Sequence, residues 1–419
     1  MTLSSESKLQ YREGILSVEQ MDRRRFVATV SSGLTGVALS AAAGEAPTGG
    51  KIPRIVLGRT KLEVSRIALG TVSPPDRAVL AYCAQQGLNF IDAAPNYANG
   101  RSEEAVGQRF RELGLKRDQF ILTSKTKSRD PSQWPNLIAE SCKRMGTDRL
   151  DIFHAHSIGG WGGRPGQRIE DSTTWLLKSE VARAVAELKK SGLIRAFGYS
   201  CHVTQRDWVN ELIRESAKGE HIDVLMVRYN FRELGDRELA ESLAIAHKAG
   251  QGVVAMKSQA GAKDSPDKVK PFLEGGFNHW QAAIRWAASN PSVHVVCANM
   301  TTLEMARDNL TAIKQPHLSA RELNQLMLYA QATASNACRM CATCVPVCPR
   351  GIAIPEILRA VMYHDDYGDG QMARQTYGEI NPQWRADRCG DCGTCERVCP
   401  NGLTVRSHLA RAARVFSLT

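Results

Sequence analysis

The sequence predicts an α/β fold in which a (β/α)8 TIM barrel is followed by a small, cysteine-rich domain. From residue 50 onward, short apolar runs alternate with amphipathic, helix-like stretches. The alternation repeats about eight times over about 250 residues, which is typical of this barrel. An open doubly wound sheet is the alternative, but no G-x-G-x-x-G motif follows the first strand. Eight of the 12 cysteines lie beyond residue 337.

The apolar runs predict the positions of the strands. Residues 55–65 are expected to form a small hairpin before a barrel domain that spans residues 50–314. Helices are expected between the barrel strands, for example over 102–113 and 179–192, where Ser179 is a predicted N-cap and Gly192 marks the helix exit. The eight barrel strands are predicted near residues 66–70, 88–92, 119–124, 149–156, 194–200, 222–227, 252–256 and 293–297.

Ionisable side chains occur where consecutive predicted strands end. Asp92, Lys125 and His156 close the second, third and fourth strands, and Tyr97 lies in the loop after Asp92. In this barrel the strand ends meet at one mouth, where catalytic residues lie. Taken singly, Asp92 could be a helix cap and His156 a core histidine, but their coincidence at one mouth favours an active site.

These four residues suit proton transfer to a carbonyl oxygen. A phenol with a pKa of about 10 is a weak acid at neutral pH. A lysine ammonium beside it would lower that pKa, and an aspartate would keep the lysine charged. A histidine could orient the substrate or relay the proton. We expect this layout for a general acid that works while hydride reaches the carbonyl carbon.

Two cysteine runs near the end of the chain predict iron–sulfur clusters. Residues 338–349 and 389–400 both have the spacing C-x2-C-x2-C-x3-C-P. In two-cluster ferredoxins with this spacing, the fourth cysteine of each run binds the other cluster. The runs therefore predict a ferredoxin-like domain at residues 338–419 with two 4Fe–4S clusters. The predicted ligands are Cys338, Cys341, Cys344 and Cys399 for one cluster, and Cys389, Cys392, Cys395 and Cys348 for the other.

Zinc and disulfide bonds are the alternatives for these cysteines. A zinc site usually takes two separated C-x2-C pairs, which is not the spacing found here. Disulfide frameworks are typical of small secreted domains rather than of a long chain with a large core. The remaining cysteines are expected to be small buried hydrophobic residues: Cys83, Cys142, Cys201 and Cys297.

Residues 315–337 are assigned to a linking helix, because Ser319 and Glu322 have capping-box spacing. The 40 residues between Cys348 and Cys389 are predicted to be a turn-rich elaboration, too short for a separate core. The domain is expected to depend on its clusters for stability. Similar apolar segments follow the two cysteine runs, which indicates an internal duplication with a pseudo-twofold axis.

The first 46 residues resemble a twin-arginine export signal of bacteria. Arg23 and Arg24 precede a mildly apolar stretch over residues 27–43, which ends in small residues with an A-x-A-like cleavage site. This stretch is too short and polar for a transmembrane helix of about 20 apolar residues. We expect a periplasmic or otherwise exported protein with no transmembrane segment in the mature chain. An ordinary basic helix start is the alternative.

The net charge of +11 is spread along the chain without interleaved aromatic residues, which argues against nucleic-acid binding. The long loop at residues 157–175 is rich in glycine and follows the fourth strand. It is a candidate substrate contact, with Trp161 as a stacking surface and a sugar or other polyol as one substrate. A lid without a binding role is the equal alternative.

The sequence resembles the aldo-keto reductase superfamily over residues 53–314. The matching stretches are RIVLGRTKLEVSRIALGT, GLNFIDAAPNYANGRSEEAVG, ILTSKT, DRLDIFHAH, IRAFGYSCH and the late DNL. The resemblance implies that Tyr97 is the general acid/base, Lys125 the residue that lowers its pKa and Asp92 the counter-ion of the lysine. It also implies that His156 orients the substrate carbonyl. With its signal and cysteine runs, the chain is similar to the iron–sulfur aldo-keto reductases of bacteria.

The resemblance further implies NADP or NAD as cofactor, although the dinucleotide site departs from the family. Met256 stands where an aromatic residue usually stacks on the nicotinamide, and Asn299 and Met305 replace basic residues for the 2′-phosphate. Lys257 or Arg307 are candidate substitutes for that charge. The predicted cofactor-binding residues are Gly70, Thr71, Ser200, Cys201, Met226, Lys257 and Asn309.

The predicted function is an exported oxidoreductase that interconverts a carbonyl and an alcohol with bound NAD(P)(H). The alternative is an electron-transfer protein whose barrel docks a partner and no longer turns over nicotinamide. Hydride carries two electrons and a 4Fe–4S cluster one, so the clusters are expected to serve a redox partner protein or the structure.

Overall fold

The computed structural model describes residues 50–158, 174–202, 206–233, 236–259 and 266–416. Two predictions lie outside these residues: the twin-arginine region with Arg23 and Arg24, and the loop residue Trp161.

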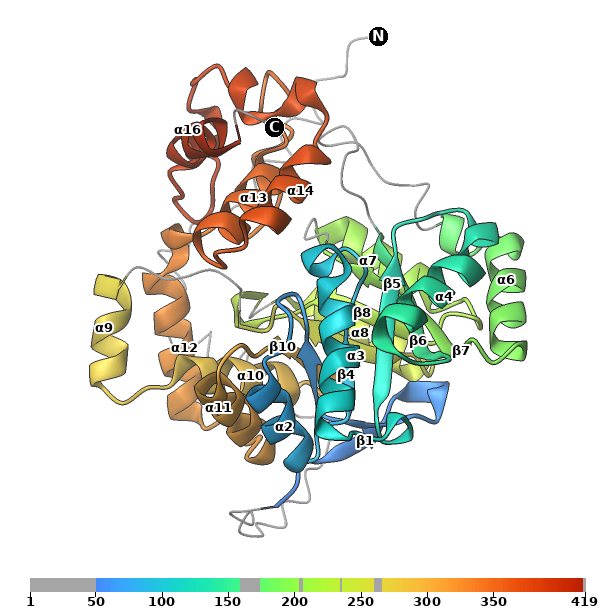
Figure 1. The fold of residues 1–419 in the computed structure, drawn as a ribbon. Coiled ribbons are helices and arrows are strands. Elements are labelled where there is room, and N and C mark those ends of the chain that lie inside the picture. Colours follow the sequence, from blue (N-terminus) through green and yellow to red (C-terminus); the bar gives the residue numbers. More distant parts are fainter. Residues whose placement is uncertain (1–49, 159–173, 203–205, 234–235, 260–265, 417–419) are drawn as a thin grey trace. The chain divides into compact units, whose positions relative to one another are not determined.

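Eight parallel strands close into a barrel, as predicted (Figure 1). Each strand pairs with the next along the chain, and the last pairs with the first to complete the ring. The predicted positions agree with the observed bounds to within about two residues. The strands are β3 (Ile67–Gly70), β4 (Phe90–Asp92), β5 (Ile121–Thr126), β6 (Leu150–Ile158), β7 (Ile194–Cys201), β8 (Val224–Arg228), β9 (Gly252–Met256) and β10 (Val295–Asn299).

Amphipathic helices surround the barrel, as α6 illustrates. This helix buries Val181, Val185 and Leu188, which recur at helical spacing on one face. The predicted N-cap Ser179 is wrong, because the extended residue Lys178 precedes the helix and Ser179 is its first residue. The helices of this layer are α2 (Arg77–Gln85), α3 (Arg101–Leu113), α4 (Trp134–Met145), α6 (Ser179–Lys190), α7 (Arg206–Ser216), α8 (Arg237–Lys248), α10 (His279–Ser289) and α11 (Leu303–Lys314). The helix α9 (Pro266–Glu274) packs instead against α12 (Ala320–Ala332).

The predicted hairpin closes one end of the barrel. Its strands, β1 (Arg54–Val56) and β2 (Glu63–Ser65), pair antiparallel, and Leu57 between them packs into the apolar barrel interior. A Cβ at Gly252 would lie 2.6 Å from the Leu57 side chain, so only glycine allows this approach. With this end filled by side chains, a site can form only at the other end, where the strands finish.

The linking helix α12 (Ala320–Ala332) begins with the predicted capping box, in which Ser319 and Glu322 satisfy each other's backbone groups. In the described residues beyond it, the regular elements are helices: α13 (Ile354–Asp365), α14 (Gly370–Gly378), α15 (Thr394–Arg397) and α16 (Val405–Val415).

The prediction for residues 349–388 is wrong in one respect. This segment forms α13 and α14, whose apolar residues build much of the core of the C-terminal domain, together with Leu409 and Phe416. The turn signals in the segment had suggested irregular structure. The helices are stabilised instead by burial of residues such as Ile357 and Tyr377.

The predicted internal duplication is visible in the backbone around the cysteines. Met340 and Asp391, which correspond in the two runs, are both left-handed with φ of 59° and 53°. Gly351 and Gly402, which follow the runs, share a φ of 63°. The two runs therefore fold alike, and the helices α13 and α16 begin at matching positions after them, at Ile354 and Val405.

None of the helices in the described part of the chain combines the length and apolarity needed to cross a bilayer.

Candidate active site and iron–sulfur sites

Lys125 and Asp92 form a buried ion pair at the mouth of the barrel. The Lys125 Nζ lies 2.6 Å from Asp92 Oδ1 and 2.8 Å from the carbonyl oxygen of Ala93. Thr123 donates a further hydrogen bond to the same carboxylate oxygen at 2.9 Å. Asp92 ends β4 and Lys125 lies on the neighbouring strand β5, so the sheet register brings them together. A buried pair of this kind needs such additional hydrogen bonds to offset desolvation.

Tyr97 and His156 complete the predicted group of four. The Lys125 ammonium lies 4.9 Å from the centre of the Tyr97 ring, and the Tyr97 and His156 rings meet edge to face at 6.0 Å. Tyr97 and His156 are buried, and both face one cavity of about 510 Å³ that Asp92 also lines. The structure thus brings all four predicted residues to one place.

The loop that carries Tyr97 has a strained backbone. Ala98 and Asn99, directly after the tyrosine, are both left-handed, with φ of 49° and 54°. Such conformations disfavour residues other than glycine and cluster at functional sites. Two side chains of α14 hold this loop: Gln375 donates to Asn99, and Gln371 accepts from Arg101, which itself donates to the Ala98 carbonyl.

The electrostatics of Tyr97 differ from the expectation. Burial raises the pKa of Tyr97 well above its ordinary value, and Asp92, Cys297 and Tyr363 raise it further. Lys257 opposes this shift in the pKa, and Lys125, whose charge is matched by Asp92, lies beside the ring. At neutral pH the phenol therefore keeps its proton and can donate it.

His156 is held in its neutral form. Burial and the charges of Lys125 and Lys127, with His202 and His154 nearby, hold the pKa of His156 well below its usual range. Its Nδ1 is buried and has no hydrogen-bond partner among the described residues. A neutral imidazole facing the cavity can accept or donate one hydrogen bond to a bound carbonyl or hydroxyl group.

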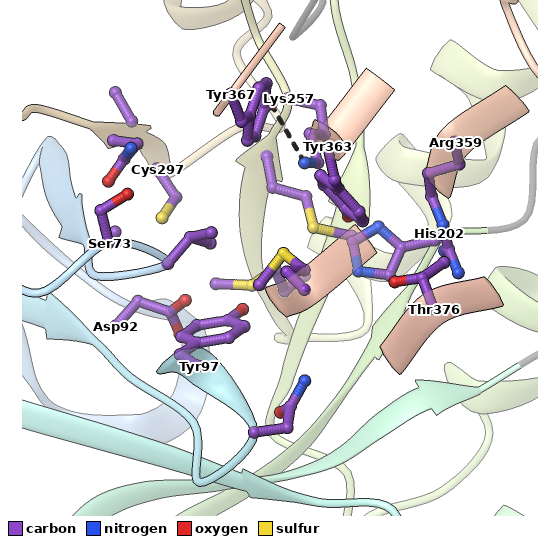
Figure 2. Close-up of a pocket in the computed structure, with 18 of the residues that line it drawn as sticks. Ser73, Asp92, Tyr97, His202, Lys257, Cys297, Arg359, Tyr363, Tyr367 and Thr376 are labelled. Carbon is purple, nitrogen blue, oxygen red and sulfur yellow. Dashed lines mark hydrogen bonds between the residues drawn. The ribbon is translucent and has the colours of Figure 1, made fainter. Parts of the chain in front are cut away.

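The cavity is lined by both domains, which the sequence did not indicate. Figure 2 shows barrel residues such as Tyr97 and Lys257 facing the same space as Arg359, Tyr363 and Tyr367 of the C-terminal domain. One signal could have identified two of them: Arg359 and Tyr363 are four residues apart on α13, which places them on one helix face, and Tyr367 follows just after the helix ends. His202, just after β7, and Cys297 on β10 also line the cavity and were not predicted as site residues.

The predicted cofactor-binding residues divide into two groups. Gly70, Met226 and Lys257 line the cavity, together with Met256, Asn299 and Met305. The hydroxyls of Thr71 and Ser200 are buried in hydrogen bonds within the barrel, to the Asp92 carbonyl and from the Ser157 amide. Cys201 is fully buried, and Asn309 is buried and accepts from Gln259 at 2.8 Å. Arg307 lies over the ring of Tyr82, away from the cavity lining.

Some cavity residues fit a nicotinamide dinucleotide. A Cβ at Gly70 would lie 3.3 Å from Cys297 Sγ, so glycine keeps this wall open. Asn299 Oδ1 is buried, borders the cavity and has no partner among the described residues. Met226 and Met256 supply an apolar, adaptable surface for an aromatic ring.

The cysteines of the first run gather around a second, smaller cavity. Cys338, Cys341 and Cys344 line it together with Cys399 of the second run. This is the combination that the interleaved spacing predicts for one cluster. Four cysteines gathered in this way with a largely apolar lining suit an iron–sulfur cube, which they would bind as thiolates.

Backbone amides are aimed at the cysteine sulfurs in matching positions of the two runs. The Met340 amide donates to Cys338 Sγ at 3.3 Å, and the Asp391 amide donates to Cys389 Sγ at 3.4 Å. The amides of Ile352 and Leu403 likewise donate to Cys348 and Cys399, at 3.4 and 3.5 Å. Such N–H···S bonds stabilise thiolates bound to a cluster and tune its potential.

Comparison with known proteins agrees with both domains. Residues 54–264 match the model of the aldo/keto reductase family, and residues 337–404 match that of a 4Fe–4S dicluster domain. The chain belongs to the aldo/keto reductase family, and it is an oxidoreductase of that family with an added 4Fe–4S dicluster domain.

Three relatives illustrate the extent of the similarity. An uncharacterized oxidoreductase of Bacillus subtilis, YqkF, is 23% identical over 66% of this chain and 95% of its own length. The NADH-specific methylglyoxal reductase of Escherichia coli is 28% identical over 42% of this chain and 59% of its own. A solved aldo-keto reductase of Bacillus halodurans has the same fold, with a TM-score of 0.52 and 21% identity over 67% of this chain and 97% of its own.

Proposed function

We propose that the protein interconverts a carbonyl and an alcohol by hydride transfer with NAD(P)(H). The observation that carries this proposal is the buried Lys125–Asp92 pair at 2.6 Å, beside a protonated Tyr97 that faces a cavity with His156. A reduced nicotinamide bound in this cavity would supply the hydride. The printed name of the E. coli relative, an NADH-specific reductase, supports a nicotinamide cofactor.

The side chains of this chain divide the remaining work. His156, neutral and buried, orients the carbonyl through one hydrogen bond. Tyr97 donates its phenolic proton to the carbonyl oxygen in reduction and accepts it in oxidation. Lys257 and Lys125 stabilise the phenolate that is formed, since a nearby cation favours the charged form of a phenol, and Asp92 holds Lys125 in place. The helices α13 and α14 cover the cavity and limit the access of water to it.

We further propose that the C-terminal domain holds two 4Fe–4S clusters, with interleaved ligands, and that they serve a redox partner or the structure rather than the hydride step. The exposed Cys392 would bring the edge of one cluster to the surface, where a partner could reach it. If NADH or NADPH reduced the clusters of the pure protein at the rate of catalysis, the proposal that the clusters take no part in the hydride step would be wrong.

Export by the twin-arginine route is also a proposal, which rests on the sequence around Arg23 and Arg24. It accords with clusters assembled in the cytosol before the folded chain is transported. Cell fractionation tests it: replacing both arginines with lysine should leave the protein in the cytosolic fraction, and unchanged periplasmic recovery would contradict it.

The central experiment is anaerobic purification followed by identification of the molecules released on denaturation. Bound NAD or NADP together with about eight iron atoms per chain supports the proposal. Iron without nucleotide, combined with no nucleotide binding in titration, would favour a protein whose barrel does not turn over nicotinamide.

A further inference from the structure

Two cations from distant parts of the chain line the cavity that Tyr97 faces. Lys257 follows β9 in the barrel, and Arg359 lies on α13 in the C-terminal domain. The Lys257 Nζ lies 5.0 Å from the centre of the Tyr363 ring, and the Arg359 guanidinium carbon lies 5.9 Å from the same centre. Both cations therefore lie near one aromatic side chain of the cavity lining, Tyr363, as Figure 2 shows.

The ammonium of Lys257 has tyrosines as its neighbours. It donates to the Tyr367 hydroxyl at 3.2 Å and lies 4.9 Å from that ring. Within the described ranges, no carboxylate lies within ion-pair distance of it. A partly buried ammonium that faces phenols has lost part of its hydration without gaining a negative partner, which is unfavourable unless a ligand supplies one.

The acidic residues around the cavity are mostly committed elsewhere. Asp92 pairs with Lys125, and Glu379 pairs with Lys127. Asp366 also lines the cavity, and Glu356 interacts electrostatically with Arg359 but does not line it. Among the described residues, Lys257 is therefore a cation of the cavity lining that has no carboxylate within ion-pair distance.

The backbone at Lys257 indicates that the position of this side chain matters. Lys257 is left-handed, with φ of 55°. For a residue other than glycine this conformation costs about 1–2 kcal/mol. Its ammonium lies beside Tyr363 of α13 and beside Tyr367, and strain of this kind is concentrated at ligand sites.

We propose that Lys257 and Arg359 bind an oxyanion, and that this oxyanion is the carboxylate of the substrate. The substrate would then be a hydroxy acid or oxo acid whose reacting carbon lies at Tyr97. Its carboxylate would accept hydrogen bonds from the ammonium and the guanidinium, and charge-assisted bonds of this kind are the strongest available here. The placing of the reacting carbon rests on the proposed function, whereas the anion site does not.

Paired ligands that differ only in the carboxylate test this inference. Lactate is compared with 1,2-propanediol, and gluconate with sorbitol, by calorimetric titration of the cluster-loaded protein. We expect at least one acid to bind about tenfold or more tightly than its neutral partner. Equal binding within both pairs, or no binding of either acid at millimolar concentration, would overturn the proposal.

Two variants assign the effect to the cations. Lys257→Met and Arg359→Met should each weaken acid binding about 10- to 100-fold and leave the neutral partner unaffected. Lys257→Arg should retain most of the preference. Lys143→Met removes an exposed lysine of α4 and serves as the control for net charge. Arg359 is buried, so its replacement risks misfolding the protein. If that variant misfolds, Lys257→Met and Lys257→Arg still test the proposal.

The phosphates of a dinucleotide are the other source of an oxyanion. If Lys257→Met weakened the binding of NADP or NAD but left the acids unaffected, the site would belong to the cofactor and the proposal would fail. Tyr97→Phe separates the two proposals: it should lower turnover about 10²- to 10⁴-fold yet keep the preference for acids in binding. If the protein turned over neutral carbonyls and showed no preference for acids, the proposed substrate class would be wrong, while the proposed hydride transfer would stand.

Discussion

Arg101 Nη2 donates to Gln371 Oε1 at 2.9 Å, and Nε of the same arginine donates to the carbonyl oxygen of Ala98, one residue after Tyr97. The first helix after the catalytic loop is thus bonded to α14 of the iron–sulfur domain. Because Tyr97 belongs to the apolar cluster formed by α13 and α14, the added domain is part of the candidate active site.

Tyr97 is expected to be the proton donor. Tyr97→Phe should lower kcat for carbonyl reduction about 10²- to 10⁴-fold, the usual contribution of a general acid, while substrate binding changes little. Tyr82→Phe, which removes a hydroxyl on α2, is the matched control. Steady-state kinetics with both variants check this, and a kcat like that of the wild type would remove Tyr97 from the mechanism.

The Lys125–Asp92 pair should show strong coupling in stability. Lys125→Met leaves Asp92 as a buried, unpaired carboxylate, which costs about 3–5 kcal/mol in the free energy of unfolding. The double variant Asp92→Leu with Lys125→Met removes both charges and should recover most of that loss. Urea unfolding of the cluster-loaded proteins measures both, and additive losses would contradict the coupling.

The interleaved cluster ligands can be tested with two pairs of substitutions. Cys338→Ala with Cys399→Ala should affect one cluster and leave about four iron atoms per chain. Cys338→Ala with Cys348→Ala should affect both clusters and leave fewer. Iron analysis and electron paramagnetic resonance after anaerobic reconstitution distinguish them. The reverse order of iron contents would show that each run binds its own cluster.

The contacts of α14 with the catalytic loop should matter for turnover. Gln371→Ala with Gln375→Ala removes the hydrogen bonds to Arg101 and Asn99 without touching a cysteine. We expect kcat to fall several-fold with an unchanged iron content, because the strained Tyr97 loop loses its support. Gln383→Ala, at an exposed residue of the same domain, is the control. An unaffected kcat would show that the loop holds its conformation alone.

Buried histidines should make the fold sensitive to acid. Burial first, then His247 and Arg66, lower the pKa of His294 to about 4, while an unfolded histidine titrates near about 6.5. Its Nδ1 accepts from the Val253 amide at 3.1 Å and must therefore stay unprotonated. Below about pH 6.5 the unfolded chain binds a proton that the native protein does not, so stability falls from there toward pH 4.

His294→Asn tests this dependence, because its amide oxygen can still accept a hydrogen bond but does not titrate. The variant should lose less of its Tm than the wild type between pH 7 and pH 4. His317→Asn replaces an exposed histidine and is the control. Parallel Tm profiles for wild type and His294→Asn would contradict the assignment.

Much of the site could be predicted from the sequence, because its signals are local. Asp92, Lys125 and His156 stand at the ends of apolar runs, and parallel strands finish at the same mouth. The cysteine spacing is likewise a property of a few neighbouring residues, and the structure places Cys399 with the first run as the interleaved spacing predicts.

The sequence by itself determined the barrel, the order of its strands, the four residues at the mouth and the two cysteine runs. The tertiary structure alone decided that Arg359, Tyr363 and Tyr367 line the cavity that Tyr97 faces, and that Lys257 lowers the pKa of Tyr97 against the effect of burial. The periodicity of apolar residues indicates which face of a helix is buried, but it does not indicate which other element packs against that face. The partner of α13 lies more than 200 residues earlier in the chain, and only long-range packing brings Tyr363 to Tyr97.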